Sequence, residues 1–297
     1  MILKHKIYHK ISDAIRNGNI HRIYRIKDDK RPPSDFKLIF FCGSSGISYL
    51  NASLISVHKF WKKLPEICII SDGSPIEDIK SKLIKWPRKV TVYTWQECAQ
   101  YFLDKGDKDL YTYASNEVIG KKLIGVMYCA EKFPVLYSDS DILWFNSPTE
   151  MKLDFNLKPQ IKMSIDIDYF YTKPLLSEMN EEKCLTTKPF NSGVVFLNGS
   201  FSGFPKWESL CKFLGTNKNL GWFSEQTSFA MFNNHFNPDN YFSSEEILIK
   251  IDDEYNLRYT YKDHKKILAR HYVHIKSTTF WRDFIYMLFR KSNVSKN

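Results

Sequence analysis

The chain has 297 residues, of which 43% are hydrophobic and 15% aromatic, and a formal net charge of +10. This composition excludes a disordered chain and is enough to bury one large core or two modest ones. The positive charge favours an acidic partner, such as a nucleotide, an anionic lipid surface or nucleic acid, without choosing among them.

Hydrophobic patterns of strands and helices alternate along the first half of the chain. A helical extension is expected over residues 1–33, where "RPPS" breaks the pattern. After it, the pattern predicts strands over 36–42, 66–71, 89–95 and 133–137, separated by helices over 47–61, 76–86 and 118–131. Such alternation is typical of an α/β fold, with a mostly parallel sheet flanked by helices on both faces. We expect a single domain over residues 34–281.

The cellular setting can be predicted from what the sequence lacks. No stretch approaches the roughly 18 uninterrupted apolar residues of a membrane span, and the amino terminus has no signal-peptide core. The six cysteines are widely separated and contain no C-x-x-C pair, which favours core residues in a reducing compartment. We therefore expect a soluble, cytoplasmic protein.

The stretch "FPVLYSDSDILWF", residues 133–145, places two aspartates one residue apart in an apolar run. Asp139 and Asp141 follow a central strand, and open α/β sheets bind ligands at the carboxyl ends of their strands. Carboxylates spaced i, i+2 on extended backbone project to the same side and can share one divalent cation, which keeps open positions for phosphate oxygens. Two unpaired buried charges would be costly, so we predict a metal site here.

The same D-x-D spacing occurs twice more. Asp107 and Asp109 lie in a charged stretch with no strand before it, which favours a solvated surface. Asp166 and Asp168 are a more serious rival, because Asp166 also ends a predicted strand.

Four motifs together resemble one family. They are "VLYSDSDILWF" (135–145), "FNSGVVFLN" (190–198), "SEQTSF" (224–229) and "HYVHIKSTTFW" (271–281). In this order they resemble the nucleotide-diphosphosugar glycosyltransferases of GT-A fold, especially retaining enzymes of the glycogenin and lipopolysaccharide galactosyltransferase kind. The likeness runs from about Phe36 to Trp281 and implies a Rossmann-like GT-A domain.

The resemblance implies a donor site at the ends of the first strands. Asp72 would face the nucleotide, although an ordinary Asp-Gly turn explains it equally well. Lys122 would contact the donor, unless Lys121 and Lys122 are plain surface residues. The other residues implied in nucleotide binding are Phe41, Cys42, Gly43, Ser44 and Ser140.

His271 is the third metal ligand that the resemblance implies. An imidazole beside two carboxylates suits Mn²⁺ better than Ca²⁺ or Mg²⁺, with Mg²⁺ as the alternative ion. The chain departs from the family at His274, which stands where a small residue is usual, so His274 could instead be the ligand or bind phosphate. Lys276 would neutralise the departing diphosphate.

The implied reaction transfers a sugar from a nucleotide diphosphate, for which UDP is expected, to a hydroxyl of a glycan, lipid-linked or protein acceptor. Asn191 would orient a hydroxyl, or simply form a turn. Gln226 would stabilise the oxocarbenium ion. Glu225 would contact sugar hydroxyls or act as a weak nucleophile, with retention of configuration, whereas Glu225 as a general base would give inversion. We expect retention.

Two other classes remain as alternatives. A haloacid dehalogenase-like, Mg²⁺-dependent phosphohydrolase also carries D-x-D after a strand, and Asp252 and Asp253 could imitate its late acids, but its motif opens the domain. A nucleic-acid-binding protein would fit the charge, yet the lysines form no stripe and no known module is present. We expect no nucleic-acid partner.

Residues 282–297 predict a basic amphipathic tail. Phe284, Ile285 and Leu288 can share one helical face with Trp281, while Arg282 and other cations add positive charge. Such a segment suits the surface of an anionic membrane, which leaves peripheral membrane contact open, or it docks against the protein's own core.

Overall fold

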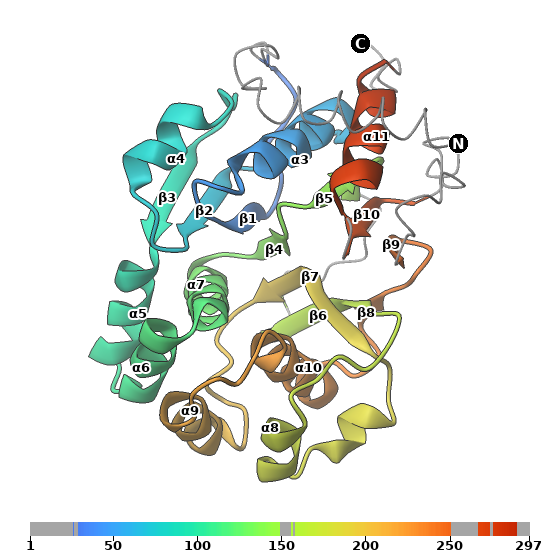
Figure 1. The fold of residues 1–297 in the computed structure, drawn as a ribbon. Helices are drawn as coiled ribbons and strands as arrows, with labels where there is room; N and C mark the ends of the chain where they lie inside the picture. Colours follow the sequence, from blue (N-terminus) through green and yellow to red (C-terminus); the bar gives the residue numbers. More distant parts are fainter. Residues whose placement is uncertain are drawn as a thin grey trace.

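The computed structural model describes residues 26, 29–148, 156, 158–250, 267–273 and 276–289. These residues form a mixed α/β domain around a seven-stranded sheet in the order β3-β2-β1-β4-β7-β6-β8 (Figure 1). Most of the expected amino-terminal extension lies outside the described residues. The strands are β1 (Lys37–Cys42), β2 (Ile67–Ser71), β3 (Val90–Thr94), β4 (Val135–Ser138), β6 (Gln160–Ile165), β7 (Phe190–Asn198) and β8 (Tyr241–Phe242).

The first half of the sheet is the parallel unit that the alternating pattern predicts. Strands β3, β2, β1 and β4 all run in the same direction. Crossover helices join them, because parallel strands cannot be connected by a hairpin. These helices are α3 (Ile47–Phe60), α4 (Ile76–Lys82), α5 (Trp95–Asp104), α6 (Lys108–Asn116) and α7 (Val118–Lys132). The predicted α/β class is confirmed, while α5 and α6 were not anticipated.

The second half of the sheet contains an antiparallel insertion. Strand β7 pairs antiparallel with both β4 and β6. Its register against β6 jumps, because Met163 lies opposite Val195 whereas the next residue, Ser164, lies opposite Asn191. Residues 192–194 are therefore extra residues in β7, a bulge of the kind that redirects backbone at the edge of a site. Helices α8 (Lys173–Glu178), α9 (Trp207–Thr216) and α10 (Ser224–Phe236) accompany this half.

A second, three-stranded sheet carries the late histidine motif. Its order is β5 (Ile142–Trp144), β10 (Ala269–Tyr272) and β9 (Ile247–Lys250). Strand β10 pairs antiparallel with β5, and His271 lies opposite Ile142. Because Ile142 directly follows the acidic pair, this register brings the two distant motifs together.

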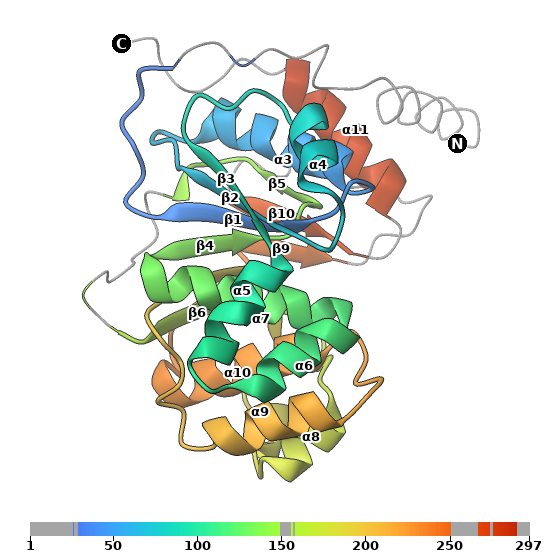
Figure 2. The same cartoon turned by 90° about the vertical axis from the view of Figure 1, so that its left-hand side faces the viewer.

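The hydrophobic core lies on both faces of the large sheet. Figure 2 shows α3, α4 and α11 (Lys276–Phe289) on one side, and α5, α6, α7, α9 and α10 on the other. Alternate residues of β1 feed the two layers, since Leu38 and Phe40 belong to one buried cluster and Ile39 to the other. This alternation is the expected consequence of a strand covered on both faces.

The carboxyl-terminal segment packs against the chain itself where it is described. Helix α11 begins at Lys276, before the expected tail, and contacts α3. Trp281 and Phe284 lie in the core, and Arg282 is also buried. These side chains dock against the protein's own core, which is the second of the two expected alternatives. Residues 290–297 lie outside the described residues. Within the described part of the chain, no helix combines the length and apolar character needed to cross a bilayer.

His58, near the end of α3, should make stability depend on pH. Burial and, to a smaller extent, Arg31 lower the pKa of His58 to about 4, although Asp29, whose Oδ2 lies 3.1 Å from His58 Nε2, opposes the shift. Because the unfolded histidine has a pKa near 6.5, the unfolded state binds more protons below that pH. Neutral His58 therefore stabilises the fold fully above about pH 6.5 and progressively less as the pH falls toward about 4.

A variant comparison isolates this effect. We expect the free energy of unfolding of the wild type, minus that of His58→Phe, to decrease from about pH 7 to about pH 4 in urea titrations. The difference is needed because burial raises the pKa of Glu225 to about 7, which gives the opposite slope in the same range. A difference that stays constant would contradict the prediction.

Candidate active site

The acidic pair lies at the carboxyl end of β4, as the sequence predicts. The backbone N–H of Asp139 donates to Gly193 O of β7 at 2.8 Å. The carbonyl of Asp141 accepts from Tyr272 N of β10 at 3.2 Å. The loop that carries both carboxylates is thus held between the two sheets, with Asp141 buried and Asp139 partly exposed.

His271 completes a group of three candidate metal ligands. Its Nε2 lies 3.7 Å from Asp139 Oδ2 and 3.5 Å from Asp141 Oδ1. One ligand atom from each residue lies within 4.8 Å of the others. Neighbouring ligands of a cation bound at about 2.1 Å are about 3 Å apart, so small adjustments would let all three reach one ion. Two carboxylates and an imidazole fit a divalent cation, and Mn²⁺ suits such a mixed set.

Hydrogen bonds fix the tautomer of His271. Asn191 Nδ2 donates to Asp166 Oδ2 at 2.8 Å, and Asn191 Oδ1 accepts from Gly193 N at 2.8 Å, which orients the amide. The same Oδ1 lies 3.0 Å from His271 Nδ1, so Nδ1 must carry the proton there. The lone pair of Nε2 then faces the two carboxylates. Such support orients a ligating histidine and increases its basicity.

Gly193 is required for this close approach. A Cβ on Gly193 would lie 2.4 Å from Cε1 and Nδ1 of His271. Gly43 has the same function at the end of β1, where a Cβ would lie 1.9 Å from Asp72 Oδ2. A side chain at Gly193 would therefore displace the His271 ring, and one at Gly43 would displace the Asp72 carboxylate.

Lys122 extends from α7 into a buried cluster beside the acidic pair. Its Nζ lies 3.3 Å from both Asp139 Oδ1 and Glu225 Oε1, and 4.6 Å from the centroid of the Tyr137 ring. Burial alone would lower the pKa of Lys122, but the two carboxylates outweigh it and raise that pKa. Lys122 is therefore a fixed cation. The hydroxyl of Tyr137 donates to Asp139 Oδ1.

The acidic-Gln pair begins α10, and its two side chains have different surroundings. Ser192 Oγ donates to Glu225 Oε2 at 2.8 Å, and Glu225 is only 1% exposed. Burial raises the pKa of Glu225 to about 7, although Lys122 opposes the shift. Gln226 Oε1 accepts from Ser192 N at 3.1 Å, and Gln226 Nε2 donates to Phe170 O at 2.9 Å. Gln226 lines the cavity beside the acidic pair, whereas Glu225 lies behind Ser192.

Asp166 belongs to the same site and is not a competing one. It follows β6, and because β4 and β6 both run antiparallel to the intervening β7, their carboxyl ends lie at the same edge of the sheet. Asp166 is buried, and it accepts from Asn191 and from Gln226, whose Nε2 lies 3.4 Å from Oδ2. Burial raises the pKa of Asp166. The predicted strand that ends at Asp166 was the sequence signal for this residue. Its hydrogen bonds to Asn191 and Gln226 were not predicted. Asp168 is exposed.

A cavity of about 630 Å³ opens beside these groups. Its polar wall contains the three candidate ligands, and its other walls are apolar or aromatic. The lining residues are Phe41, Val118, Ile119, Lys122, Asp139, Ser140, Asp141, Asp166, Ile167, Phe170, Asn191, Trp222, Phe223, Gln226, His271 and Val273. This volume suits one small organic ligand.

The remaining predicted nucleotide-binding residues lie at adjoining strand ends. Cys42 is buried, and burial raises the pKa of its thiol to about 12, so the thiol is protonated at neutral pH. Ser44 N donates to Ser74 Oγ, and Asp72 Oδ1 accepts from Ser74 N, which makes Asp72 the first residue of an Asx turn. His274 lies outside the described residues. Lys276 begins α11, and its side chain is likewise outside the described part of the chain.

A buried ionic cluster fixes the strand that carries His271. Asp283 of α11 accepts from Arg270 Nη1 at 3.1 Å, from Tyr272 OH at 2.8 Å and from Arg282 Nε at 2.8 Å. Asp283 and both arginines are buried. Arg270 and Tyr272 flank His271 in β10, so this cluster positions the histidine from behind.

Replacing Asp283 with asparagine should therefore destabilise the fold by about 3–5 kcal/mol, because it removes the carboxylate that neutralises two buried guanidinium groups. Urea unfolding would measure the loss. The exposed helix residue Asp78 offers a matched control, since Asp78→Asn should cost less than about 0.5 kcal/mol. Equal effects of the two variants would contradict the proposed importance of the cluster.

Comparisons with known proteins show the fold. No protein-family model matches the chain, and no curated protein matches it. Mouse xyloside xylosyltransferase 1 has a similar structure, with a TM-score of 0.53 and 15% identity over 80% of this chain and 97% of that one. The galactosyltransferase LgtC, solved with donor and acceptor sugar analogs, has a TM-score of 0.51 and 16% identity, over 85% of this chain and 95% of that one. The bifunctional glycosyltransferase WbbM has a TM-score of 0.55 and 12% identity, over 90% of this chain and 51% of that one. The predicted GT-A fold is therefore confirmed.

Proposed function

We propose that this chain is a metal-dependent glycosyltransferase, which moves a sugar from a nucleotide-diphosphate donor, a UDP-sugar, to an acceptor hydroxyl with retention of configuration. One observation carries the proposal. In a GT-A fold, Asp139, Asp141 and His271 converge at the carboxyl edge of the sheet, beside a cavity of about 630 Å³. Ligands of open α/β sheets bind at that edge.

Asp139, Asp141 and His271 would hold the divalent cation, for which we propose Mn²⁺. When bound, the cation supplies positive charge to the diphosphate leaving group. Only small side-chain adjustments would be needed, because backbone hydrogen bonds to Gly193 and Tyr272 hold the loop that carries both carboxylates. The positive charge of the chain as a whole also favours an anionic donor.

The floor of the cavity would bind the donor sugar. Asn191, Gln226 and Asp166 form a continuous hydrogen-bonded row there. Gln226 is fixed at both ends of its amide, by Ser192 N and Phe170 O. A carbonyl dipole held in this way stabilises positive charge that develops on a sugar ring, without the cost of reorienting at the moment of reaction.

The burial of Glu225 supports retention. A general base for the acceptor must reach the attacking hydroxyl. Glu225 is 1% exposed and faces Lys122 and Ser192, so it is placed to position other groups. Gln226 then remains as the residue of the pair that faces the sugar.

The test is a panel of nucleotide sugars incubated with and without Mn²⁺, with release of the nucleotide as the readout. We expect slow hydrolysis of one UDP-sugar that requires the metal. The phosphohydrolase alternative predicts a different result, namely Mg²⁺-dependent release of phosphate from a generic phosphate ester that Asp139→Asn abolishes. That second result, without any hydrolysis of nucleotide sugars, would overturn the proposal.

A further inference from the structure

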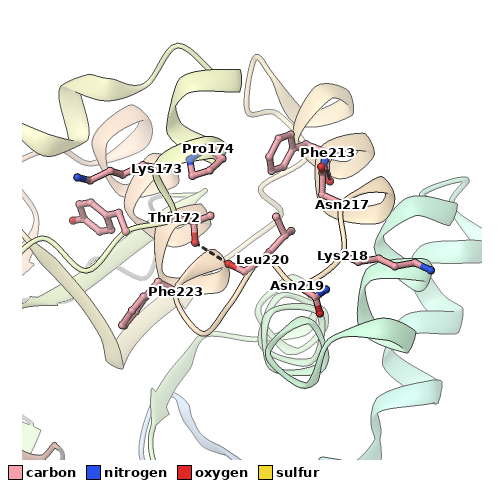
Figure 3. Close-up of a pocket in the computed structure, with 10 residues that line it drawn as sticks. Thr172, Lys173, Pro174, Phe213, Asn217, Lys218, Asn219, Leu220 and Phe223 are labelled. Atoms are coloured by element: carbon pink, nitrogen blue, oxygen red, sulfur yellow. Dashed lines mark hydrogen bonds between the residues drawn. The ribbon is translucent and has the colours of Figure 1, made fainter.

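A second cavity, of about 530 Å³, shares one lining residue with the first. Figure 3 shows the residues that line it. It opens between the start of α8, the end of α9 and the loop that leads into α10. Its lining consists of Tyr171, Thr172, Lys173, Pro174, Phe213, Asn217, Lys218, Asn219, Leu220 and Phe223. None of the residues in the proposed chemistry belongs to this lining, and the two cavities share only an aromatic wall at Phe223.

Phe223 lines both cavities. Its ring stacks on Phe170, with centroids 5.5 Å apart and planes 22° apart. Trp222, the neighbouring residue, lines the first cavity and is 74% exposed. An exposed tryptophan in the lining of a cavity offers a flat apolar surface to a ligand. A ligand that extends out of the first cavity would pass over these rings into the second.

The loop that forms this wall is anchored on both sides. Asn219 N donates to Glu117 Oε1 at 2.7 Å, which ties the loop to the start of α7. Thr172 Oγ1 donates to Leu220 O at 3.4 Å, the bond drawn in Figure 3. Asn219 and Gly221 have positive φ values of 61° and 78°, so the chain adopts a tight and specific turn here. The second cavity is therefore a shaped part of the fold.

The lining has the mixed chemistry of a carbohydrate site. Phe213, Pro174 and Phe223 supply apolar surface, while asparagine and threonine side chains supply donors and acceptors. A pyranose ring presents apolar C–H faces and a rim of hydroxyls, which matches both. A hydrocarbon chain would leave the polar groups without ligand contacts. The side chains of Lys173 and Lys218 extend away from the centre in Figure 3, which favours a neutral ligand over an anionic one.

We propose that the second cavity is a distal acceptor subsite, which binds the sugars that follow the accepting sugar in a neutral oligosaccharide. This inference rests on the proposed function, and it names the acceptor class as a glycan of at least two sugars. The accepting sugar lies over Trp222 and Phe223, and the next sugar lies between Pro174 and Phe213. A single sugar leaves the second cavity unused.

The experiment measures binding directly, so that it does not depend on turnover. Neutral trisaccharides of glucose, galactose, xylose or N-acetylglucosamine, and the four monosaccharides, are titrated by saturation-transfer NMR in the presence of UDP and Mn²⁺. We expect at least one trisaccharide to bind more tightly than its monosaccharide. Phe213→Ala removes an apolar wall, and Asn217→Trp fills the cavity. Each variant should lower the affinity for that trisaccharide by about tenfold.

Controls separate a local effect from unfolding. Lys212→Trp adds the same side chain to an exposed position of α9 outside the lining, and it should leave trisaccharide binding unchanged. Thermal unfolding checks all three variants, and Asn217→Trp is decisive if Phe213→Ala proves unstable, since Asn217 is exposed.

Three results would overturn the proposal. They are the failure of every trisaccharide to bind better than its monosaccharide, equal trisaccharide binding by wild type and Asn217→Trp, and tighter binding of dodecyl glucoside below its micelle concentration than of any trisaccharide. Hydrolysis of nucleotide sugars by the same proteins tests the proposed function separately. If the wild type hydrolyses no donor but binds a trisaccharide, and the variants weaken that binding, the second cavity is still a sugar site. The transferase proposal is then contradicted.

Discussion

Replacing Asp141 with asparagine should reduce metal-dependent cleavage of the donor by roughly 10³-fold. Asparagine keeps the shape of the side chain but removes one negative charge from a set in which Asp141 Oδ1 lies 3.5 Å from His271 Nε2. The cation would then be held by one carboxylate and one imidazole. The readout is nucleotide release from a UDP-sugar over a titration of Mn²⁺, and higher metal concentrations should restore part of the rate.

The stability of the variant distinguishes a loss of metal binding from a loss of structure. Without metal, Asp141→Asn should still unfold cooperatively in urea, because asparagine keeps the shape of the side chain and removes repulsion from nearby Asp139. Asp168→Asn is the matched control, since Asp168 belongs to an identically spaced pair but is exposed. Asp168→Asn should keep the wild-type rate. A wild-type rate for Asp141→Asn at low Mn²⁺ would contradict the metal assignment.

The position of the acidic pair could be predicted from sequence because it depends on local features. Apolar residues before Asp139 predict a buried strand, and the carboxyl end of such a strand faces ligands in any open α/β sheet. Nothing beyond that pattern and the alternation of elements was needed. The structure places Asp139 directly after β4, which ends at Ser138.

The choice of the third candidate ligand depends on a strand register that one sequence does not contain. His271 and His274 lie in the same short motif, and the resemblance implied His271 while leaving His274 open as an alternative. His271 of β10 pairs with Ile142 of β5, although the two residues are 129 positions apart in the chain. This pairing places His271 beside Asp141. Pairing between distant strands depends on packing throughout the fold, so local patterns do not determine it.

The same limit explains why the supporting residues were missed. Asp166 looked like a rival of Asp139, because sequence alone does not show that β7 inserts antiparallel between β4 and β6. Glu225 and Gln226 are neighbours on one helix, yet the bulge in β7 gives Ser192 contacts to both and leaves only Gln226 facing the cavity. These assignments follow from tertiary geometry.

Lys122 should be the positively charged side chain on which both the free energy of unfolding and the rate of donor cleavage depend most strongly. Lys122→Met leaves Glu225 buried without the cation that lies 3.3 Å from its Oε1. We expect the free energy of unfolding to fall by about 1–3 kcal/mol in urea titrations, because Glu225, whose pKa burial already raises to about 7, can take up a proton when Lys122 is lost. Donor cleavage should fall as well, because Asp139 loses the charge at 3.3 Å that holds its carboxylate in place.

A double variant separates the two effects. Glu225→Gln alone should cost about 1 kcal/mol, because burial already raises the pKa of Glu225 to about 7 and an amide can still accept from Ser192. In Lys122→Met/Glu225→Gln the buried charge is absent, so the double variant should be more stable than Lys122→Met alone, with a coupling energy of about 1–3 kcal/mol. Donor cleavage should remain low, since Asp139 still lacks its lysine. Additive stability losses would mean that the two side chains do not interact, and recovery of activity in the double variant would mean that Lys122 serves only to neutralise Glu225.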